Sequence, residues 1–229
     1  MNTLAIVIAC GKEEQIAPGT DTAFLSLGNR PVLAHSLGIL HASAAVDEIV
    51  VAVSKDRVDS ALQVIKRFGC TKVRGIVVGS ANRLNTLRTV YAKLTETVTS
   101  IIVHEASRPF ISNETICESV KAAKRYGCAI AAHRIPDAVK LASKGLKPDK
   151  TLERNSVWMA QTPQVFRVEV FEKIISPKNK SIKLIDDESE WVKKPAEVHM
   201  VEAGYGNIKI RTADDFSEVA ALFSARINR

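Results

Sequence analysis

Short runs of apolar residues recur along the chain, and most of them are unbroken by any polar residue. Residues 4–9 (LAIVIA), 49–53 (IVVAV), 76–78 (IVV) and 101–103 (IIV) are of this kind. A strand covered on both faces has such a sequence, because neither of its sides meets water. Each run therefore predicts a buried strand.

The stretches between these runs are amphipathic, with apolar residues three or four positions apart, which is typical of helices that cover a sheet. Near the end, Thr212-Ala213-Asp214-Asp215 fits a capping box that starts the last helix. The apolar positions are Leu33, Leu37 and Leu40, then Val58, Ala61, Ile65 and Phe68, then Ile116, Val120 and Ala123, then Phe216, Val219 and Phe223.

Buried strands that alternate with helices predict an α/β fold, a Rossmann-like, doubly wound and mostly parallel sheet. We expect one domain over residues 1–229. In such sheets the ligand crevice lies at the carboxyl ends of the strands. The predicted site is therefore built from the loops that follow Ala9, Val78 and Val103.

The alternation breaks between residues 138 and 154. Residues 139–142 and 151–153 flank the turn signals Ser143-Lys144-Gly145 and Pro148-Asp149. This pattern predicts a β-hairpin that projects from the domain. Because a lone hairpin is marginally stable in water, we expect this arm to pack on something, and a second subunit is one candidate.

Composition narrows the class of partner. The chain is 46% apolar and 25% charged, with a net charge of +7 and a pI of about 9.3. A basic surface favours anionic partners, although the basic residues are dispersed and a solvated basic face explains them equally well. Aromatic residues make up only 5% and no nucleic-acid-binding signature is present, so we expect no nucleic-acid partner.

The sequence also predicts a cytoplasmic protein without a membrane span, because no apolar run approaches the roughly 18 residues that cross a bilayer and no signal peptide is recognisable. The four cysteines, Cys10, Cys70, Cys117 and Cys128, are widely spaced and form no CxxC pair. They are interpreted as free thiols, and we expect no protein-bound metal site.

Polar residues directly after the predicted strands are the candidates for chemistry. Ala9-Cys10-Gly11-Lys12 ends the first strand, and such a loop either offers backbone N–H groups to a phosphate or simply makes a turn. Glu105 and Arg108 follow residues 101–103. Arg108 fits a phosphate and Glu105 a ribose hydroxyl or a metal, and the alternative is a structural Glu–Arg pair.

Two further segments place polar groups among apolar ones. Residues 158–164 read WMAQTPQ, which is too specific a string for a generic loop, and residues 206–210 read GNIKI. The second puts Lys209 inside an apolar run, where a buried stem with a salt partner is expected. An ordinary lysine on an edge strand is the alternative. His104 is expected to be a structural histidine.

Several strings resemble motifs of the 2-C-methyl-D-erythritol 4-phosphate cytidylyltransferase family and of the related ribitol-phosphate cytidylyltransferases. They occur in the family's order and span nearly the whole chain. The strings are LSLGNRPVLAHS (25–36), VVGSANRLNTL (77–87), VHEASRPF (103–110), AQTPQVF (160–166) and GNIKIRTADD (206–215).

The resemblance implies transfer of CMP from CTP to 2-C-methyl-D-erythritol 4-phosphate, with magnesium as cofactor, in the non-mevalonate route to isoprenoids. It implies a homodimer in which the hairpin of one subunit reaches the other. It also assigns roles to residues. Ala9, Cys10, Gly11, Gly79, Arg83 and Thr86 would bind the nucleotide, Glu105, Arg108, Arg154 and Thr162 would bind the acceptor, and Lys209 would act at the reaction centre, with Lys12 as a second catalytic cation.

The phosphate loop departs from the family pattern, AAGxGxR…PKQ. Glu13 stands at the second glycine, Gln15 at the arginine and Thr22 at the lysine. Glu14 adds to Glu13 a second negative charge where a triphosphate would lie. In the acceptor pocket, Ala138 and Ile185 stand where the family has threonine.

Three functions therefore stay open at this stage. The first is methylerythritol-phosphate cytidylyltransferase activity, with Lys12 or magnesium in place of the missing cations. The second is cytidylyl transfer to another polyol phosphate, which a changed acceptor pocket favours. The third is a catalytically impaired homologue that binds a nucleotide or a protein partner, which the changed phosphate loop favours.

Overall fold

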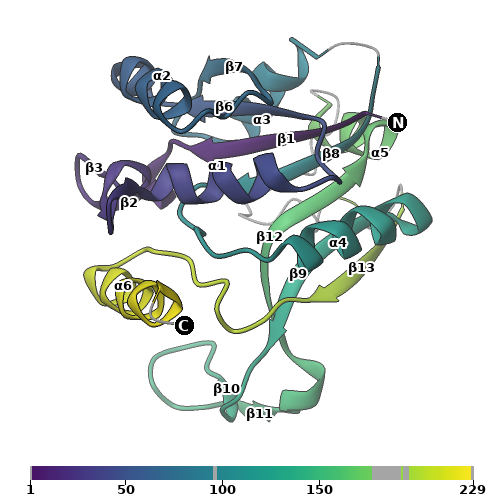
Figure 1. Cartoon of the computed structure of the whole chain (residues 1–229). Coiled ribbons are helices and arrows are strands. Elements are labelled where there is room, and N and C mark those ends of the chain that lie inside the picture. The colour runs from purple at the N-terminus through teal and green to yellow at the C-terminus, as the bar shows by residue number, and fades with distance from the viewer. Residues whose placement is uncertain (1, 95–96, 177–191, 193–195, 228–229) are drawn as a thin grey trace.

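A seven-stranded sheet organises the protein, with the strand order β13-β9-β12-β8-β1-β6-β7 (Figure 1). The computed structural model describes residues 2–94, 97–176, 192 and 196–227. The pairings of β1 with β6 and β8, of β6 with β7 and of β13 with β9 are parallel, whereas β12 is antiparallel to both of its neighbours. The sheet strands are β1 (Asn2–Ala9), β6 (Glu48–Val53), β7 (Val73–Val78), β8 (Val98–Glu105), β9 (Gly127–Arg134), β12 (Trp158–Arg167) and β13 (Glu197–Glu202).

Helices cover both faces of this sheet, as the doubly wound fold predicts. Alternate residues of β1 point to opposite faces: Ala5, Val7 and Ala9 join one core cluster, and Leu4, Ile6 and Ile8 join another. The first cluster includes residues of α1 (Val32–Ala42), α2 (Val58–Arg67) and α4 (Asn113–Tyr126), and the second includes residues of α3 (Arg83–Tyr91) and α5 (Val168–Ile175).

The last helix, α6 (Ala213–Ile227), forms a third, smaller apolar cluster with side chains from distant parts of the sequence. Its Val219 packs with Leu27, Val32, Phe110 and Ile210. The predicted capping box is present, because the Asp215 N–H donates to Thr212 Oγ1 at 3.1 Å and the Thr212 N–H donates to Asp215 Oδ2 at 2.9 Å. These two hydrogen bonds fix the first turn of α6.

The long loop after β1 contains short elements of its own. Gly11 has φ +99°, a conformation that side-chain-bearing residues rarely adopt, and it turns the chain sharply at the edge of the sheet. The elements that follow are η1 (Lys12–Glu14), β2 (Gln15–Ala17), β3 (Thr20–Asp21), η2 (Thr22–Phe24), β4 (Ser26–Leu27) and β5 (Arg30–Pro31), and farther along the chain come η3 (Lys55–Arg57) and η4 (Arg154–Ser156).

The predicted hairpin is also present. Strands β10 (Val139–Leu141) and β11 (Lys150–Leu152) pair antiparallel and extend away from the sheet (Figure 1). Nearly all of the arm is exposed, and Leu146 at its tip is 101% exposed. No helix in the described part of the chain is long and apolar enough to cross a membrane.

Candidate functional site

The carboxyl ends of β1, β7 and β8 bring the predicted site residues together at one edge of the sheet. Gly11 follows β1, Gly79 follows β7, and Glu105 is the last residue of β8. The segment from Asn207 to Arg211, which precedes α6, lies against the same edge, because the Ile210 N–H donates to the Ser107 carbonyl at 3.0 Å. Four distant parts of the sequence thus meet where the fold predicts a ligand.

A buried carboxylate with three cations forms the centre of this edge. Glu105 Oε2 accepts from Arg108 Nε at 2.7 Å, and Oε1 accepts from Lys209 Nζ at 2.7 Å and from Arg83 at 3.2 Å. Arg108 also donates to the Asn207 carbonyl at 2.9 Å. The contact between Glu105 and Arg108 is the structural pair that the sequence left open, and Lys209 has the salt partner expected for its buried stem.

The charge on Glu105 is stable because its partners outweigh its burial. Burial disfavours the ionised carboxylate, but Arg108, Lys209 and Arg83 together hold the pKa of Glu105 well below its ordinary value. Both of its oxygens accept hydrogen bonds from cations. Glu105 therefore anchors the cations and is not available as a general base.

Glu14, from η1, is a second buried carboxylate in contact with Lys209. Its Oε1 lies 3.4 Å from Lys209 Nζ and accepts from the Ser107 hydroxyl at 3.1 Å, while Oε2 accepts from the Ser107 N–H at 3.2 Å. Burial, with the nearby charge of Glu105, raises the pKa of Glu14 to about 7 against the pull of Lys209. Lys209 thus bridges two carboxylates.

A chain of hydrogen bonds through Thr162 and His104 fixes the backbone that carries Glu105 and Arg108. Thr162 Oγ1 accepts from the Glu105 N–H at 3.1 Å and lies 3.2 Å from His104 Nδ1, while His104 Nε2 lies 3.2 Å from the Arg108 carbonyl. The carbonyl requires Nε2 to carry the proton, so Nδ1 accepts from the Thr162 hydroxyl. Burial lowers the pKa of His104 to about 4, and the ring is neutral near pH 7. This is the structural role that the sequence predicts for His104.

The residues assigned to the nucleotide also lie together. Thr86 Oγ1 accepts from the Ser80 N–H at 2.9 Å, and its oxygen is 3.9 Å from Cys10 Sγ. A Cβ atom at Gly79 would collide with Cys10 Sγ and press on Thr86. The loop after β7 therefore packs directly on the end of β1, and burial raises the pKa of the Cys10 thiol.

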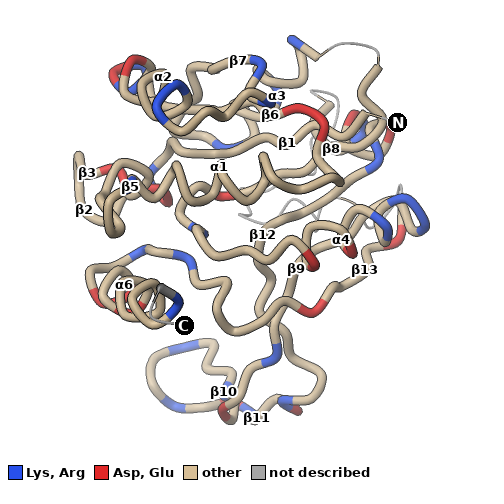
Figure 2. The backbone as a smooth tube through the Cα atoms, viewed as in Figure 1, with Lys and Arg blue, Asp and Glu red and all other residues tan. Residues whose placement is uncertain are grey.

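A cavity of about 240 Å³ opens next to the cation cluster. Arg108, Lys209 and Arg211 line it together with Gln161, Tyr205 and two acidic residues of α6, Asp215 and Glu218. In Figure 2 the chain that leads into α6 is marked by basic residues. Three cations at one small cavity fit an anionic group such as a phosphate.

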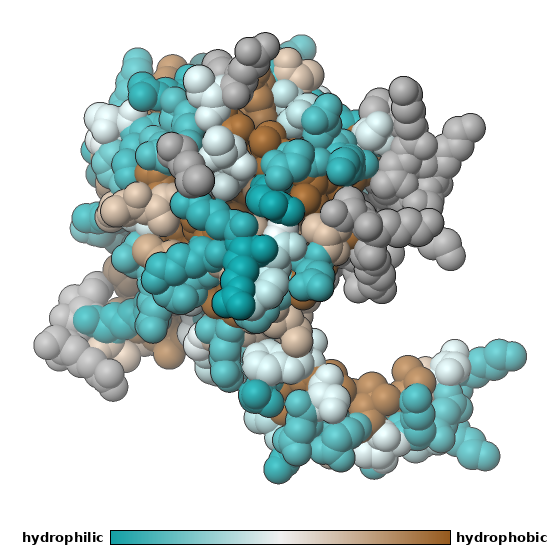
Figure 3. Space-filling model, turned by 90° about the vertical axis from the view of Figure 1, so that its right-hand side faces the viewer, coloured by the Kyte–Doolittle hydropathy of each residue, from teal (hydrophilic) through white to brown (hydrophobic). Residues whose placement is uncertain are grey.

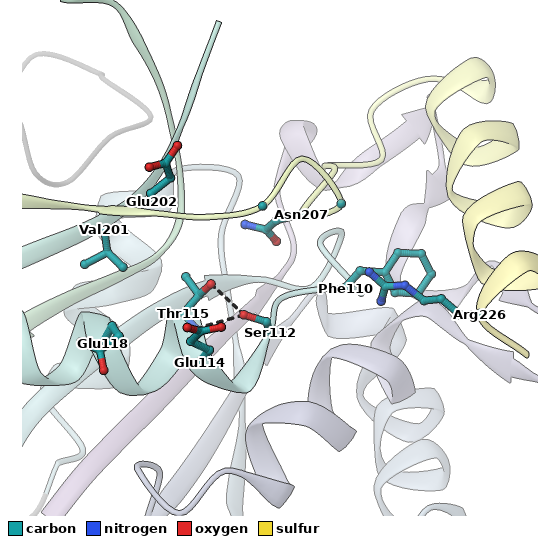
Figure 4. A pocket seen from close by; sticks show the side chains of 11 residues that line it. Phe110, Ser112, Glu114, Thr115, Glu118, Val201, Glu202, Asn207 and Arg226 are labelled. Carbon is teal, nitrogen blue, oxygen red and sulfur yellow. Dashed lines mark hydrogen bonds between the residues drawn. The ribbon is translucent and has the colours of Figure 1, made fainter. Parts of the chain in front are cut away.

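A second cavity, of about 320 Å³, has the opposite character (Figure 4). It lies between the start of α4 and the end of β13, and Glu114, Glu118 and Glu202 line it. Its one basic lining residue, Arg226, stacks over Phe110, 4.4 Å from the ring centre. Three carboxylates disfavour a phosphate there, so the cation-lined cavity is the candidate substrate site.

Some predicted site residues lie elsewhere. Lys12 is exposed at the start of η1 and does not enter the buried cluster. Arg154 is exposed at the base of the arm, where it donates to the Pro136 carbonyl at 3.3 Å. Ala138 is exposed at the same base, and Ile185 falls outside the described residues.

Two residues of the site, Ser107 and Asn207, received no role from the sequence. Ser107 holds Glu14. Asn207 ties two segments together, because its Nδ2 donates to Gln161 Oε1 and to the Thr162 carbonyl, both at 2.9 Å. Each lies within a motif that the sequence singles out, so the motif was the available signal, but a polar side chain's partner cannot be read from its neighbours in the chain.

Comparisons with known proteins agree over nearly the full length. The family model described as 2-C-methyl-D-erythritol 4-phosphate cytidylyltransferase matches residues 3–225. Proteins with that name from Geobacillus kaustophilus and Alkaliphilus metalliredigens are 32% and 30% identical to the chain. The first match covers 99% of both chains, and the second covers 92% of this chain and 88% of the relative.

Solved structures agree as well. That of the Francisella tularensis 2-C-methyl-D-erythritol 4-phosphate cytidylyltransferase matches with a TM-score of 0.79 at 26% identity, covering 97% of this chain and all of the other. That of 4-diphosphocytidyl-2C-methyl-D-erythritol synthase from Anaerococcus prevotii has a TM-score of 0.85 at 24% identity, over 97% of this chain and 98% of the other, and supports the fold alone.

Proposed function

Because the chain belongs to the 2-C-methyl-D-erythritol 4-phosphate cytidylyltransferase family, we propose that it transfers CMP from CTP to 2-C-methyl-D-erythritol 4-phosphate and releases pyrophosphate. The observation that carries the proposal is a site in two connected parts, the cavity lined by Arg108 and Lys209 and the segment that holds Gly79, Arg83 and Thr86. Glu105 connects them, because it accepts hydrogen bonds from Arg108, Lys209 and Arg83. One part fits the acceptor's phosphate and the other the nucleotide.

The proposed reaction depends on cations and does not need a general base. An oxygen of the acceptor's phosphate forms a bond to the α-phosphorus of CTP, and the bond from that phosphorus to the pyrophosphate oxygen breaks. The attacking oxygen is already anionic, so no proton has to be removed from it. This agrees with a site where Glu105 is held by cations and His104 is neutral and buried. Lys209 and Arg108 would neutralise charge that develops on the phosphates.

Magnesium is part of the proposal as a companion of CTP. In the described part of the chain no group of three or more His, Cys, Asp or Glu residues is arranged for a metal ion. The oxygens of Glu105 and Glu14 already accept hydrogen bonds from cations, a hydroxyl or an N–H group. These residues do not fit a resident magnesium ion, so the ion would arrive with the triphosphate as its ligand.

We also propose that the protein is a cytoplasmic homodimer with no membrane or nucleic-acid partner, in which the arm contacts the second subunit. The two other functions, transfer to a different polyol phosphate and a nucleotide-binding homologue with impaired catalysis, are outcomes of the test below. The impaired homologue has a structural observation in its favour, because a second carboxylate, Glu14, lies 3.4 Å from Lys209 Nζ.

The test is a pyrophosphate-release assay with CTP, magnesium and a panel of polyol phosphates that includes 2-C-methyl-D-erythritol 4-phosphate. We expect turnover with that acceptor, and a fall in kcat of about 10²–10³-fold for Lys209→Gln, as for loss of one stabilising group at a transition state. Lys66→Gln, an exposed lysine on α2, is the matched control and keeps the wild-type rate. Release with another polyol phosphate only, or with none, contradicts the proposal.

A further inference from the structure

Glu14 places a negative charge of the protein itself where the site is built to hold a negative ligand. Its carboxylate contacts Lys209 at 3.4 Å and takes both donors of Ser107, the hydroxyl and the N–H group. A cation, a hydroxyl and a backbone N–H that converge on one oxyanion are the donors that bind a phosphate oxygen elsewhere in proteins. In the ligand-free protein, Glu14 occupies them.

The charges of the cluster show why this contact matters. Three cations, Arg83, Arg108 and Lys209, face two carboxylates, Glu14 and Glu105. These five described groups together carry one net positive charge while Glu14 is ionised and two when Glu14 is protonated. A triphosphate brings several negative charges to this edge, and a carboxylate that already contacts Lys209 would repel them across a buried, poorly screened distance.

Glu14 differs from Glu105 in how readily it can lose its charge. Glu105 contacts all three cations, whereas among the described residues Glu14 contacts Lys209 and accepts hydrogen bonds from the neutral hydroxyl and N–H of Ser107. Burial with the nearby Glu105 raises the pKa of Glu14 to about 7, so both of its protonation states are populated near neutral pH. The groups that face Glu14 are Lys209, Glu105, Arg83 and Ser107, with the Cys10 thiol at the end of β1.

We propose that Glu14 competes with the nucleotide's phosphates for Lys209 and Ser107, so that CTP binds to the form of the protein in which the Glu14 carboxyl has taken up a proton from solvent. Glu14 is then a residue that sets nucleotide affinity and its pH dependence. The inference rests on the proposed function only in taking CTP as the nucleotide. It concerns binding and not turnover.

The test compares Glu14→Gln with Glu13→Gln, which removes the same charge from the exposed neighbouring position of η1. Titration calorimetry with CTP and magnesium is done at pH 6 and pH 8. A carboxyl with a pKa of about 7 is nine-tenths ionised at pH 8, so we expect Glu14→Gln to bind CTP about tenfold more tightly than Glu13→Gln at that pH and within about twofold of it at pH 6. Because both variants meet the same nucleotide, its own titration cancels.

Equal affinities of the two variants at pH 8, or a tightening of the same size at both pH values, would overturn the proposal. A measurement on the wild-type protein covers the case in which Glu14→Gln does not fold. Calorimetry at pH 8 in buffers of different ionisation enthalpy counts the protons taken up on CTP binding. We expect uptake approaching one proton per CTP, and no uptake contradicts the proposal.

These outcomes are separate from those of the proposed function. Tighter binding by Glu14→Gln without pyrophosphate release from any acceptor would refute the reaction and support the competition. Pyrophosphate release by the wild-type protein with equal affinities of the two variants would support the reaction and refute the competition.

Discussion

Single polar residues at this site are ordered by hydrogen bonds that run beneath the charged cluster. His104 and Thr162 link the N–H of Glu105 to the carbonyl of Arg108, so the backbone on both sides of the ion pair is fixed. If His104 were protonated, Nδ1 would become a donor that faces a hydroxyl whose oxygen already accepts from Glu105. A buried histidine in this position therefore favours the neutral form.

The free energy of unfolding at acid pH should depend on His104. The pKa of His104 is lowered to about 4 from 6.5, so between these values the unfolded chain binds more protons and the free energy of unfolding decreases as pH falls. Glu14, whose pKa is raised, has the opposite effect, since its contribution is lost as pH rises toward 7. A comparison with a variant is needed to separate the two residues.

We expect the stability advantage of the wild-type protein over His104→Asn to shrink by about 2 kcal/mol between pH 7 and pH 5. Urea denaturation at a series of pH values measures this difference. His199→Asn, at an exposed residue of β13, is the control for replacing a histidine by asparagine. An advantage over His104→Asn that is constant or grows toward pH 5 would refute the assignment of a neutral buried ring.

A single residue can be placed in the site from the sequence only where its position along the chain also fixes which way its side chain points. Glu105 and Arg108 were predicted at the crevice because they directly follow a buried strand. The sequence also marked Glu14 as a negative charge near the phosphates, but not its inward direction. That direction depends on the single turn of η1 after Gly11, since Glu14 is buried while Glu13 beside it is exposed.

At the scale of elements, the loop after β1 is tied to itself and to the segment before α2. Gln15 Nε2 donates to Asp21 Oδ1 at 3.0 Å, and Arg57 Nε contacts Asp21 Oδ2 at 2.7 Å. Thr22 is fully buried, and its hydroxyl has no hydrogen-bond partner among the residues that the structure describes. A lysine at Thr22 would thus bury an ammonium group in this arrangement, and an arginine at Gln15 would face Asp21. Restoring the family's cations would require the loop to rearrange.

The loop after β7 offers a direct test of its role, because Gly79 touches the end of β1. We expect Gly79→Ala to weaken CTP binding by about tenfold or more, since the added methyl collides with Cys10 Sγ and moves the backbone that would contact the base. Gly75→Ala, in β7 itself, meets nothing within 4 Å and is the matched control. Calorimetric titration with CTP decides the matter, and equal affinities of the two variants would remove the loop from the nucleotide site.

Four strands of the sheet were predicted from their apolar runs, whereas β9, β12 and β13 were not predicted as strands. Both faces of β1, β6 and β8 are largely buried, as predicted. β7 was found from its apolar run, but the prediction of a fully buried strand is wrong there, because β7 lies at the edge of the sheet and Val78 is 49% exposed. β12 was recognised as a motif and not as a strand, since it contains the polar run Gln161-Thr162-Pro163-Gln164. These four residues are buried, and Thr162 and Gln164 accordingly have hydrogen-bonding partners within the fold. Tertiary contacts, which local sequence does not contain, stabilise such a strand.

At the scale of the whole molecule, the arm is the part that the rest of the fold does not support. It holds only a short two-stranded ladder and carries exposed apolar residues, Leu141 and Leu146, beside several lysines (Figures 2 and 3). Figure 3 shows it extending from the body with apolar surface on view. An isolated hairpin of this size is marginally stable, so a contact outside the described chain is expected to hold it.

The arm's partner should be a second copy of the chain. We expect the wild-type protein to be a dimer at micromolar concentration in sedimentation equilibrium, and Leu146→Asp to raise the dimer dissociation constant by about tenfold or more, because a carboxylate would be buried against apolar surface. Leu62→Asp, at an exposed leucine on α2 and distant in sequence from the arm, is the control for introducing a surface charge and should leave the dimer intact.

The site gives a second readout, since Arg154 lies at the base of the arm and outside the charged cluster of its own chain. If Arg154 serves the acceptor across the dimer, the assay should show a KM for the polyol phosphate that rises with Leu146→Asp and falls again as protein concentration increases. A wild-type protein that sediments as a monomer, or a dimer that Leu146→Asp leaves unchanged, would show that the arm has another purpose.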